Sequence, residues 1–401
     1  MTVSDIGAPV VRWTHTIAAL ILMCAFAFGL CTIWIREAWP FVAFQGLLCM
    51  ALLWLLGAAI RWPAILSYSP LLCLPFLIAV LGVLQLAFAH TASMWETRRA
   101  VLEWMTYAVA AFLTFQIFRD SPLRHRSVRI FALFAAGFAI VSVIQNYTSP
   151  GRVFWVFDSG FLSEVFGPFT SHSKFANFVE LGVPCALWSA FHVRRRTRHV
   201  YVGAVAALVA AVVASASRAG VAIVLLELVI LLVGTRERRR VRLALTIGVL
   251  FLVSSAILGW EGLLERLLNS EVARDTRWPI DVSSGAMART FWLTGSGLGT
   301  WSTVYPQFAT FDAYSEINQA HCDWLQWLIE GGAPLAAILL TMMGAAVRAA
   351  TKEWWAWGFV FVWIHGLVDY PMQQTPAFAA LQIAFWGAAV TVLWKDRASP
   401  A

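Results

Sequence analysis

The stretch THTIAALILMCAFAFGLCTIWI, residues 14–35, decides the class of fold. It carries no Asp, Glu, Lys or Arg, and its length matches the roughly 20 apolar residues that an α-helix needs to cross a bilayer. It is longer than the apolar core of a secretory signal peptide, about 7–15 residues, and no A-x-A cleavage pattern follows it. We therefore predict an uncleaved transmembrane helix, so that the mature chain starts near Met1.

Composition extends this prediction to the whole chain. Of 401 residues, 60% are hydrophobic and 13% are charged, against roughly 25% charged residues in a soluble domain. The net charge of +7 comes from short basic runs between apolar segments, which is the pattern of membrane topology signals and excludes a nucleic-acid partner. Five of the six cysteines lie in apolar segments and no C-x-x-C pair occurs, so no disulfide framework, metal site or other cofactor is expected.

About twelve apolar segments are long enough to span a membrane, which predicts an all-α polytopic protein with one large outer loop between helices 9 and 10. Their approximate bounds are 14–35, 40–60, 70–89, 100–118, 128–147, 174–191, 200–217, 219–234, 241–260, 325–347, 354–369 and 376–394. We divide the chain into an N-terminal part with helices 1–5 (1–147), a region that includes the outer loop 261–323 (148–394), and a short cytoplasmic tail (395–401).

Basic residues mark alternate loops. The loops after the second, fourth, sixth, eighth and tenth spans and the C-terminus contain Arg61; Arg119, Arg124, Arg126 and Arg129; Arg194, Arg195, Arg196 and Arg198; Arg236, Arg238, Arg239 and Arg240; Arg348 and Lys352; Lys395 and Arg397. By the positive-inside rule these loops and both termini are cytoplasmic. We therefore predict a multi-pass protein of the bacterial inner membrane, whose remaining loops face the periplasm in a Gram-negative cell.

One outer loop departs from this rule, because T-R-R at residues 97–99 follows the third span. Either Arg99 pairs with Glu103 one helical turn later, or the arginines bind an anion. The sequence leaves both interpretations open, and also leaves open whether Arg98, Arg99 or Arg289 joins the anion site described next.

Most outer residues fall in two loops, 148–173 and 261–323, and a loop of some sixty residues is usually functional. The larger one opens with an amphipathic pattern at 261–271, which predicts a helix lying in the membrane interface. Four outer arginines can converge on one anion: Arg218, Arg274, Arg277 and Arg289. Planar, permanently charged guanidinium groups suit a diphosphate and require no metal, whereas the alternative for Arg218 is a snorkelling side chain.

Polar groups also enter the predicted spans from the outer side. The sixth span begins with His172, Lys174, Asn177 and Glu180, and the eleventh carries His365 and Asp369 four residues apart. Such groups line a bundle interior or a wet cavity rather than lipid, and for the last pair a structural hydrogen bond is the favoured reading. We expect Glu227 to be a buried packing contact. The run G-S-G-L-G at 295–299 follows no strand and is interpreted as a tight turn, not a nucleotide site.

Six motifs in order resemble the O-antigen ligase and polymerase superfamily of membrane glycosyltransferases. They are GPFTSHSKFA (167–176), SRAG (217–220), RDTRW (274–278), GSGLGTWSTVYP (295–306), AHCDWLQWLIEGG (320–332) and HGLVDYP (365–371). The resemblance covers roughly residues 167–371. Cys322 and Ser173 depart from it, since asparagine is common at both positions in the family.

The resemblance implies a donor, a glycan on undecaprenyl diphosphate, transferred outside the inner membrane with inversion and without a metal. It places His321 near the acceptor hydroxyl, and Arg218 and Arg277 on the diphosphate. Elementary chemistry agrees, because a neutral imidazole can accept the proton of an attacking hydroxyl and the leaving diphosphate needs charge stabilisation. Asp323 could orient the imidazole; the alternative for His321 is a helix-capping or packing histidine.

Several functions remain open from the sequence. A ligase transfers a finished glycan to lipid A core, whereas a polymerase joins it to a second lipid-linked glycan, and the sequence does not separate them. A protein O-oligosaccharyltransferase ranks third, because those relatives often carry a further C-terminal region. A polytopic transporter would show two similar halves with broken helices at matching positions, and the sequence contains no such internal repeat.

Overall fold

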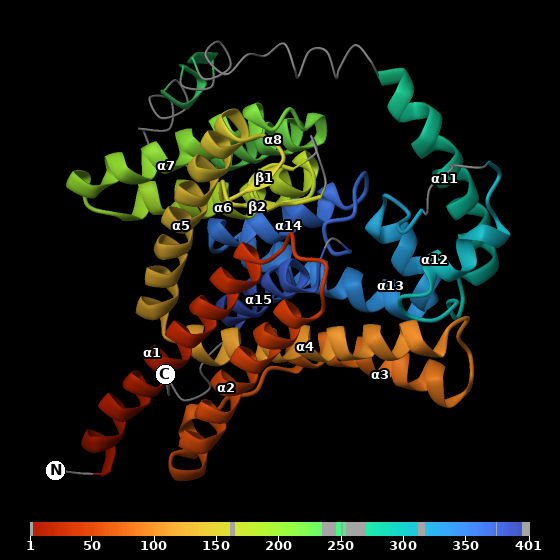
Figure 1. The fold of residues 1–401 in the computed structure, drawn as a ribbon. Coiled ribbons are helices and arrows are strands. Elements are labelled where there is room, and N and C mark those ends of the chain that lie inside the picture. Colours follow the sequence, from red (N-terminus) through yellow and green to blue (C-terminus); the bar gives the residue numbers. More distant parts are fainter. Residues whose placement is uncertain are drawn as a thin grey trace.

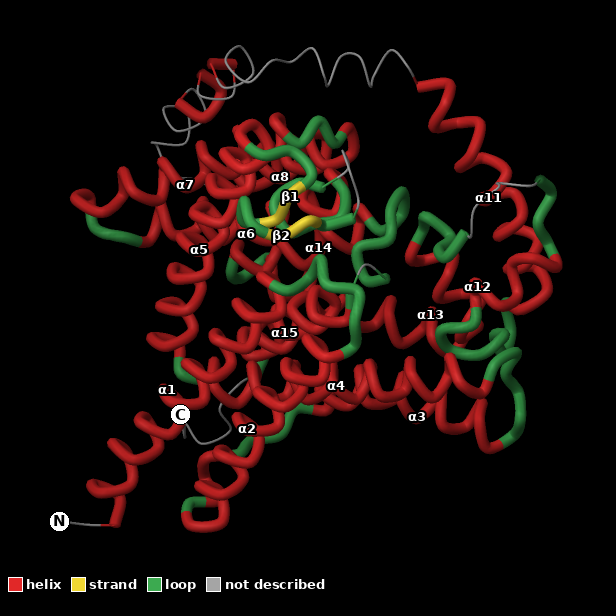
Figure 2. The backbone as a smooth tube through the Cα atoms, in the orientation of Figure 1, coloured by secondary structure: helices red, strands yellow, loops and turns green. Residues whose placement is uncertain are grey.

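The computed structural model describes residues 3–160, 165–234, 246–249, 252–253, 270–311, 317–373 and 375–394, and gives only the backbone for 3–10, 64 and 270–276. Nearly all regular structure in this part of the chain is helical (Figure 2). The all-α prediction is therefore confirmed for these residues.

Within the described residues, eight helical segments are long and apolar enough to cross a membrane. They correspond to α1 (Val3–Cys31), α2 (Trp39–Arg61), α3 (Cys73–Ala87) with the short turn before it, α4 (Met94–Phe118), α5 (Ser121–Thr148), α7 (Arg195–Ala214), α13 (Asp323–Ala350) and α15 (Pro376–Leu393). The polytopic class is thus confirmed, and Figure 1 shows these helices gathered with the others in one bundle.

Three further helices belong to the bundle without meeting that criterion: α6 (His172–His192), α8 (Arg218–Gly234) and α14 (Trp357–His365). α14 has 9 residues, so it rises only about 14 Å and is shorter than the predicted eleventh span. The predicted ninth span, 241–260, lies mostly outside the described residues. The count of twelve therefore stays a prediction.

Local sequence sets the helix ends that position the site. Ser171 caps α6, since its side chain accepts a hydrogen bond from the backbone of Lys174, as a serine N-cap is expected to do. α13 is interrupted at Gly332, whose backbone has φ 62° and ψ −160°. At that kink the amide of Ala333 donates to the carbonyl of Trp292 at 2.6 Å. The segment before the kink is thereby held against the outer polypeptide.

The loops gather at two ends of the bundle. At the first, the basic end, Arg119 donates hydrogen bonds to Ser67 and to the carbonyl of Ile65, and the imidazole of His125 lies 3.0 Å from the carboxylate of Glu353. At the other, the loop end, the described chain segments are 32–38, 88–93, 149–160, 165–171, 215–217, 292–311, 317–322, 366–373 and 375. This arrangement matches the predicted alternation of basic and other loops.

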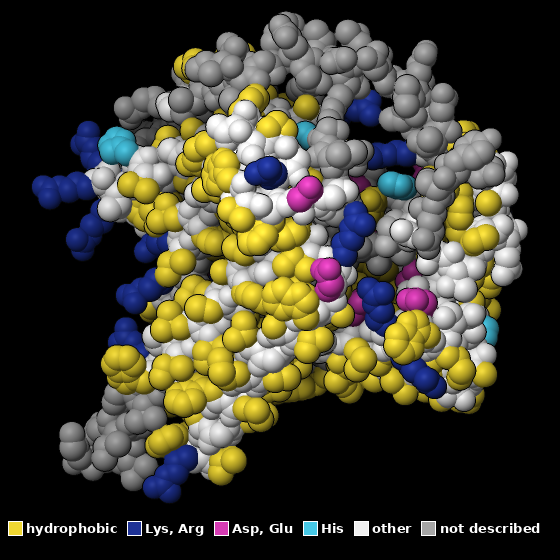
Figure 3. Space-filling model, viewed as in Figure 1, with side chains coloured by type: hydrophobic (Ala, Val, Ile, Leu, Met, Phe, Trp, Pro, Cys, Tyr) yellow, Lys and Arg dark blue, Asp and Glu magenta, His cyan; other side chains and the backbone are white. Residues whose placement is uncertain are grey.

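The surface reflects this division (Figure 3). One edge of the view carries basic side chains, and a separate hollowed area beside α4 and α13 mixes basic, acidic and histidine side chains. Between them the surface is mostly hydrophobic. Polar chemistry is thus confined to the ends, as expected of a protein surrounded by lipid.

The described part of the segment predicted as the large outer loop is folded. It contains α11 (Ser270–Phe291), α12 (Trp301–Val304) and a short turn (Tyr305–Gln307). Their buried side chains form a small second core that includes Met287, Trp301 and Ile329. Since Ile329 belongs to α13, which packs against α11, this core attaches the segment to the bundle. The predicted interfacial helix at 261–271 falls largely outside the described residues.

The other loop that was predicted to lie outside contains a hairpin of β1 (Arg152–Val153) and β2 (Phe157–Asp158), paired antiparallel. The side chain of Gln145, at the end of α5, accepts from the amide of Phe154 at 2.7 Å and donates to the carbonyl of Gly167. The loop is thereby closed over the outer ends of α5 and α6.

Candidate functional site

His321 lies at the loop end, immediately before α13. Helix α13 starts at Asp323 with Cys322 at the N-cap position, so the helix-capping alternative for His321 is not supported. His321 has φ 56°, a left-handed conformation that non-glycine residues adopt rarely and that concentrates at functional sites. Its ring meets the Tyr370 ring edge-on, with centroids 4.9 Å apart. The Nδ1 atom is buried and makes no hydrogen bond with the residues that the structure describes.

The surroundings of His321 favour a neutral imidazole. Burial lowers the pKa of His321 to about 4, with a contribution in the same direction from the charges of Arg277 and Lys174, while Asp369 acts in the opposite direction. A neutral ring can accept a proton, whereas an imidazolium cannot. The ring is therefore in the form that a general base requires at pH 7.

Lys174 connects His321 to α6. Its ammonium donates to the Thr170 hydroxyl at 3.1 Å and lies 5.5 Å from the centre of the Tyr370 ring. Tyr370 thus contacts both His321 and Lys174. The three side chains come from segments far apart in sequence, and they form one cluster at the loop end.

Asp323 is placed differently from its predicted role. It is 1% exposed, and its Oδ2 atom accepts from the amide of Met372 at 2.8 Å. Its own amide donates to the carbonyls of Gly366 and Asp369, at 2.9 and 3.2 Å. These contacts join the start of α13 to the turn between α14 and α15, which carries Tyr370. Asp323 therefore positions the partner of His321, and none of these hydrogen bonds involves the imidazole.

The predicted pair in the eleventh span becomes a buried network of three. The Nδ1 atom of His365 lies 2.6 Å from a carboxylate oxygen of Glu180, and its Nε2 atom lies 3.9 Å from Asp369. His365 and Glu180 are both fully buried. The hydrogen bond of His365 goes to Glu180 and not to Asp369, so it ties α14 to α6. Neighbouring Asn177 and Glu227 are also fully buried.

The S-R-A-G turn lies against the start of α6. The Nδ1 atom of His172 is 2.6 Å from the carbonyl of Ser215, so a neutral His172 with its proton on Nδ1 donates to this turn. A Cβ placed on Gly220 would come 2.4 Å from the Cβ of Ala176, which shows how closely α8 approaches α6. Arg218 begins α8 and is half-buried. It therefore stands beside the α6 turn that also carries Lys174.

The remaining outer arginines belong to α11. The Arg277 guanidinium is exposed, and its charge acts on His321 and on Asp281, where it opposes the rise in pKa that burial causes. The side chain of Arg274 lies outside the described residues. Arg289, in the last turn of α11, is exposed. The structure thus brings Arg277 to His321.

The G-S-G-L-G run forms the predicted tight turn, with positive φ at Gly295, Gly297 and Gly299. It wraps around Glu330: the carboxylate accepts from the amides of Gly299 and Trp301, at 2.9 and 3.3 Å. The side chain of Gln326, one turn earlier in α13, donates to the same carboxylate at 3.0 Å. The turn therefore fixes the first part of α13, and with it His321.

We predict that Gly295→Ala destabilises the protein, because an added Cβ would lie 2.2 Å from the Glu330 carbonyl and φ is 80°. The expected loss is about 1–3 kcal/mol, measured as a lower melting temperature in detergent. Gly203→Ala is the matched control, since its Cβ meets nothing within 4 Å, and it should leave the melting temperature unchanged or raise it slightly. Equal melting temperatures for both variants would contradict this account of the turn.

Two arginines left open by the sequence are now placed. The Arg99 Nε atom lies 3.1 Å from a carboxylate oxygen of Glu103, so the helical ion pair is confirmed. Arg98 is exposed. Both residues line a cavity of about 900 Å³ that Lys174 also lines.

Sequence reasoning missed three residues that shape the site. Tyr370 follows Asp369 in the motif HGLVDYP, but nothing in the neighbouring sequence shows that its ring faces His321. Glu330 shares an i,i+4 spacing with Gln326, a signal that could have suggested their contact. Gln85 donates to the carbonyl of Glu330 and accepts from the amide of Leu298, both at 3.0 Å, and such long-range bonds leave no sequence pattern.

Comparison with known proteins adds a family assignment for part of the chain. A protein-family model described as "O-Antigen ligase" matches residues 203–340. The matched segment includes Arg218, Arg277, His321 and Glu330. No curated protein matches the chain. The match supports the resemblance noted from the motifs, and residues 203–340 are similar to the O-antigen ligase family.

Proposed function

We propose that this protein transfers a glycan from undecaprenyl diphosphate to an acceptor sugar hydroxyl at the loop end of the bundle. The family match supports glycosyl transfer of the ligase or polymerase type in polysaccharide assembly. The single observation that carries the residue assignment is His321, a half-buried, neutral imidazole in a strained backbone conformation with Arg277 and Lys174 nearby. Among the alternatives, O-antigen ligase with lipid A core as acceptor is preferred.

The reaction is a single displacement with inversion. The acceptor hydroxyl oxygen attacks the anomeric carbon, the bond from that carbon to the diphosphate oxygen breaks, and the hydroxyl proton passes to His321. Undecaprenyl diphosphate leaves with the electron pair of the broken bond. Positioned positive charges stabilise such a leaving group as its charge develops, and Arg218 and Arg277 supply them without a metal.

Other residues support this chemistry. Asp323 holds the turn that carries Tyr370, and Glu330 holds the turn behind α13. Glu180, His365 and Asp369 fix α14 against α6. These residues hold the site in place, and Asn177 and His172 have the same role. Arg274 and Arg289 add positive charge to α11. The loop end faces the periplasm and both termini face the cytoplasm, because the basic loops lie at the opposite end.

The acceptor is tested directly with purified protein in nanodiscs. Undecaprenyl-diphosphate-linked glycan is supplied with or without lipid A core, and the products are separated by size. Transfer that requires the core identifies a ligase. Longer lipid-linked chains formed without core identify a polymerase with the same site. Donor recovered intact in both conditions would contradict glycosyl transfer, and movement of intact donor across closed vesicles that contain the protein would favour a transporter.

The pH dependence of kcat/KM should reflect the depressed pKa of His321. Because that pKa is about 4, the neutral base persists as the pH falls through 6.5, the ordinary histidine value, and activity declines only as the pH approaches the folded pKa. Removing a neighbouring positive charge in Arg277→Gln raises the pKa, so the acid limb should move to higher pH. An acid limb centred near 6.5 in the wild type, and unmoved in the variant, would contradict the assignment.

A further inference from the structure

The cavity of about 900 Å³ at the loop end is lined by other residues than those of the proposed diphosphate site. Four segments line it, within residues 29–45, 95–103, 170–174 and 375–377. They include the outer ends of α1, α2 and α4 and the starts of α6 and α15. Of the residues assigned to the reaction above, Lys174 lines it, whereas Arg218, Arg277 and His321 do not. The cavity therefore lies beside the proposed diphosphate site and is separate from it.

Its charge favours an anion. The basic lining residues are Arg36, Arg98, Arg99 and Lys174, and the acidic ones are Glu37 and Glu103. Glu103 pairs with Arg99 at 3.1 Å. Arg98, by contrast, is exposed and forms no ion pair within the described part of the chain. A phosphate group supplies the oxygens that such a guanidinium binds best.

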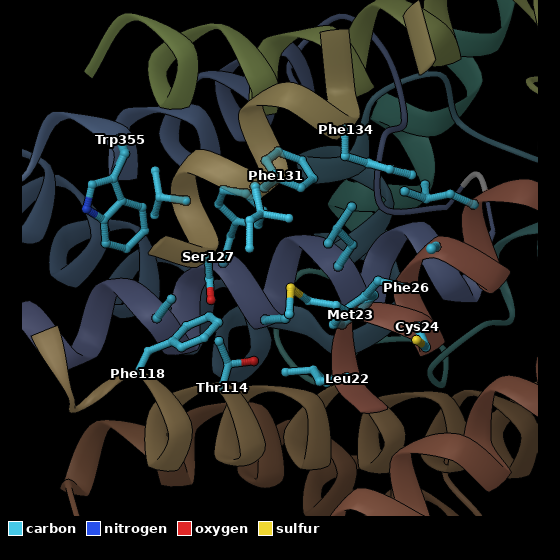
Figure 4. Close-up of a pocket in the computed structure, with 18 residues that line it drawn as sticks. Leu22, Met23, Cys24, Phe26, Thr114, Phe118, Ser127, Phe131, Phe134 and Trp355 are labelled. Carbon is cyan, nitrogen blue, oxygen red and sulfur yellow. The ribbon is translucent and has the colours of Figure 1, made fainter. Parts of the chain in front are cut away.

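A second, apolar cavity of about 320 Å³ lies among α1, α4, α5 and α15 (Figure 4). Helices α1 and α15 line both cavities: Gly29 and Ala377 border the charged one, whereas Phe26 and Leu381 border the apolar one. Along α15 the two lining positions are only about 6 Å apart at 1.5 Å per residue. Figure 4 shows aromatic and aliphatic side chains around the apolar cavity, including Phe131 and Met23. A charged compartment and an apolar one thus follow each other along the same pair of helices.

The first turn of α6 separates this cavity from the donor side. Successive helical residues are about 100° apart, so His172 and Lys174 point in nearly opposite directions. His172 contacts the carbonyl of Ser215, in the turn before Arg218. Lys174 lines the cavity and reaches the ring of Tyr370, which contacts His321. The proposed base is therefore connected to the cavity, on the side of α6 away from Arg218.

We propose that the cavity binds the phosphate-bearing head of a lipid-anchored acceptor, and that the apolar cavity beneath it holds a hydrocarbon chain of the same lipid. Arg98 binds the phosphate, and the acceptor sugar hydroxyl extends past Lys174 to His321. This assignment rests on the proposed glycosyl transfer, because it names the site of the second substrate. It requires two lipid sites, one on each side of the first turn of α6.

Binding without turnover tests the two-site arrangement. Affinities of wild type, Arg98→Gln and Arg218→Gln are measured in detergent for lipid A core and for undecaprenyl-diphosphate-linked glycan. Arg98→Gln should weaken acceptor binding about 10-fold, as expected for loss of a charge-assisted contact, and leave donor binding at the Arg218 site unchanged. Arg218→Gln should do the reverse. Arg152→Gln, exposed on β1 and outside the cavity lining, is the matched control.

Comparing the two lipids shows whether the phosphate bound in the cavity belongs to lipid A core or to undecaprenyl diphosphate. A lipid A core site sensitive to Arg98→Gln supports the proposal for a ligase. A second site for undecaprenyl-diphosphate-linked glycan, which persists in Arg218→Gln and is lost on adding Arg98→Gln, supports it for a polymerase. The proposal is overturned if Arg98→Gln changes neither the affinity for lipid A core nor the affinity for undecaprenyl-diphosphate-linked glycan. It is also overturned if the protein has only one site for undecaprenyl-diphosphate-linked glycan and Arg98→Gln abolishes binding there. Binding is measured without turnover. A preparation that binds both lipids but transfers no glycan would therefore refute the proposed reaction and leave the two lipid sites standing.

The apolar compartment is tested by filling it. Ala27→Trp places an indole in the apolar cavity that Ala27 lines, and should weaken binding of the intact acceptor lipid about 10-fold. A delipidated, phosphorylated core oligosaccharide should bind wild type and variant equally, which also reports that the variant is folded. Equal binding of the intact lipid by both proteins would overturn the assignment of the hydrocarbon chain.

Discussion

His321→Ala is expected to lower the turnover of glycan transfer by about 10²–10⁴-fold, the range typical for loss of a general base. The attacking hydroxyl must lose its proton, and the half-buried, neutral imidazole of His321 is the base that we propose. Turnover is followed as undecaprenyl diphosphate released from the glycan donor in nanodiscs. His199→Ala is the control, because His199 is exposed at the basic end of the bundle, and it should turn over at the wild-type rate.

A second variant separates chemistry from folding. Since His321 has φ 56°, alanine at this position is strained, whereas asparagine tolerates the left-handed region. His321→Asn should therefore keep the wild-type melting temperature and still lose activity. If His321→Asn retains full turnover, His321 is not the base. If both variants unfold, the residue has a structural role that the contacts with Tyr370 would explain.

Arg218→Gln and Arg277→Gln are expected to lower kcat/KM by on the order of 10²–10³-fold each, as found when one preorganised group that stabilises developing charge is removed. Lysine at position 218 should restore little activity, because an ammonium cannot bind two phosphate oxygens as a planar guanidinium does. EDTA should leave the wild-type rate unchanged. The measurement is initial rate against donor concentration, with Arg196→Gln at the basic end as the control.

The result for Arg218 is informative in either direction. A larger effect on donor affinity than on turnover would show that Arg218 binds the diphosphate in the ground state. Equal loss of turnover and kcat/KM would show stabilisation of the leaving group. Wild-type kinetics in Arg218→Gln would leave snorkelling, the alternative stated for this residue, as its explanation, and the diphosphate site would have to be placed elsewhere.

Much of the architecture follows from the sequence, because hydropathy and the placement of arginines act over short distances. The alternate basic loops predicted a bundle with two chemically different ends, and the contacts of Arg119 and Glu353 lie at one of them. The pairing of His365 and Asp369 at one helix end was also predictable from their spacing. Ser171 and its hydrogen bond to Lys174 follow the ordinary rule for a helix N-cap.

The rest depends on tertiary contacts that spacing does not encode. The ring of Tyr370 reaches His321 only because Asp323 holds the turn between α14 and α15. The predicted eleventh span is interrupted for the same reason: the chain after His365 forms that turn instead of further helix. Asp323 looked like a partner of the imidazole because it is close in sequence, yet its backbone and carboxylate are directed to the turn.

The role of Glu330 could not be predicted from the sequence either, because it depends on burial in the folded protein. Its sequence neighbourhood, at the end of an apolar stretch, indicates only a charge near a helix end. The structure buries it to 4% exposure and surrounds it with the amides of Gly299 and Trp301. Those residues lie in a loop some thirty positions away, and only the folded chain brings them together. The resemblance to a family identified the motifs without saying what this carboxylate does.

The most direct test of the central claim is whether the purified protein breaks the bond between glycan and undecaprenyl diphosphate. Wild type in nanodiscs, given the labelled lipid-linked glycan and both acceptors, should release undecaprenyl diphosphate in step with the formation of glycosylated acceptor, and His321→Asn should release none while remaining folded. Consumption of no donor by folded wild-type protein, or equal release by the variant, would contradict the account.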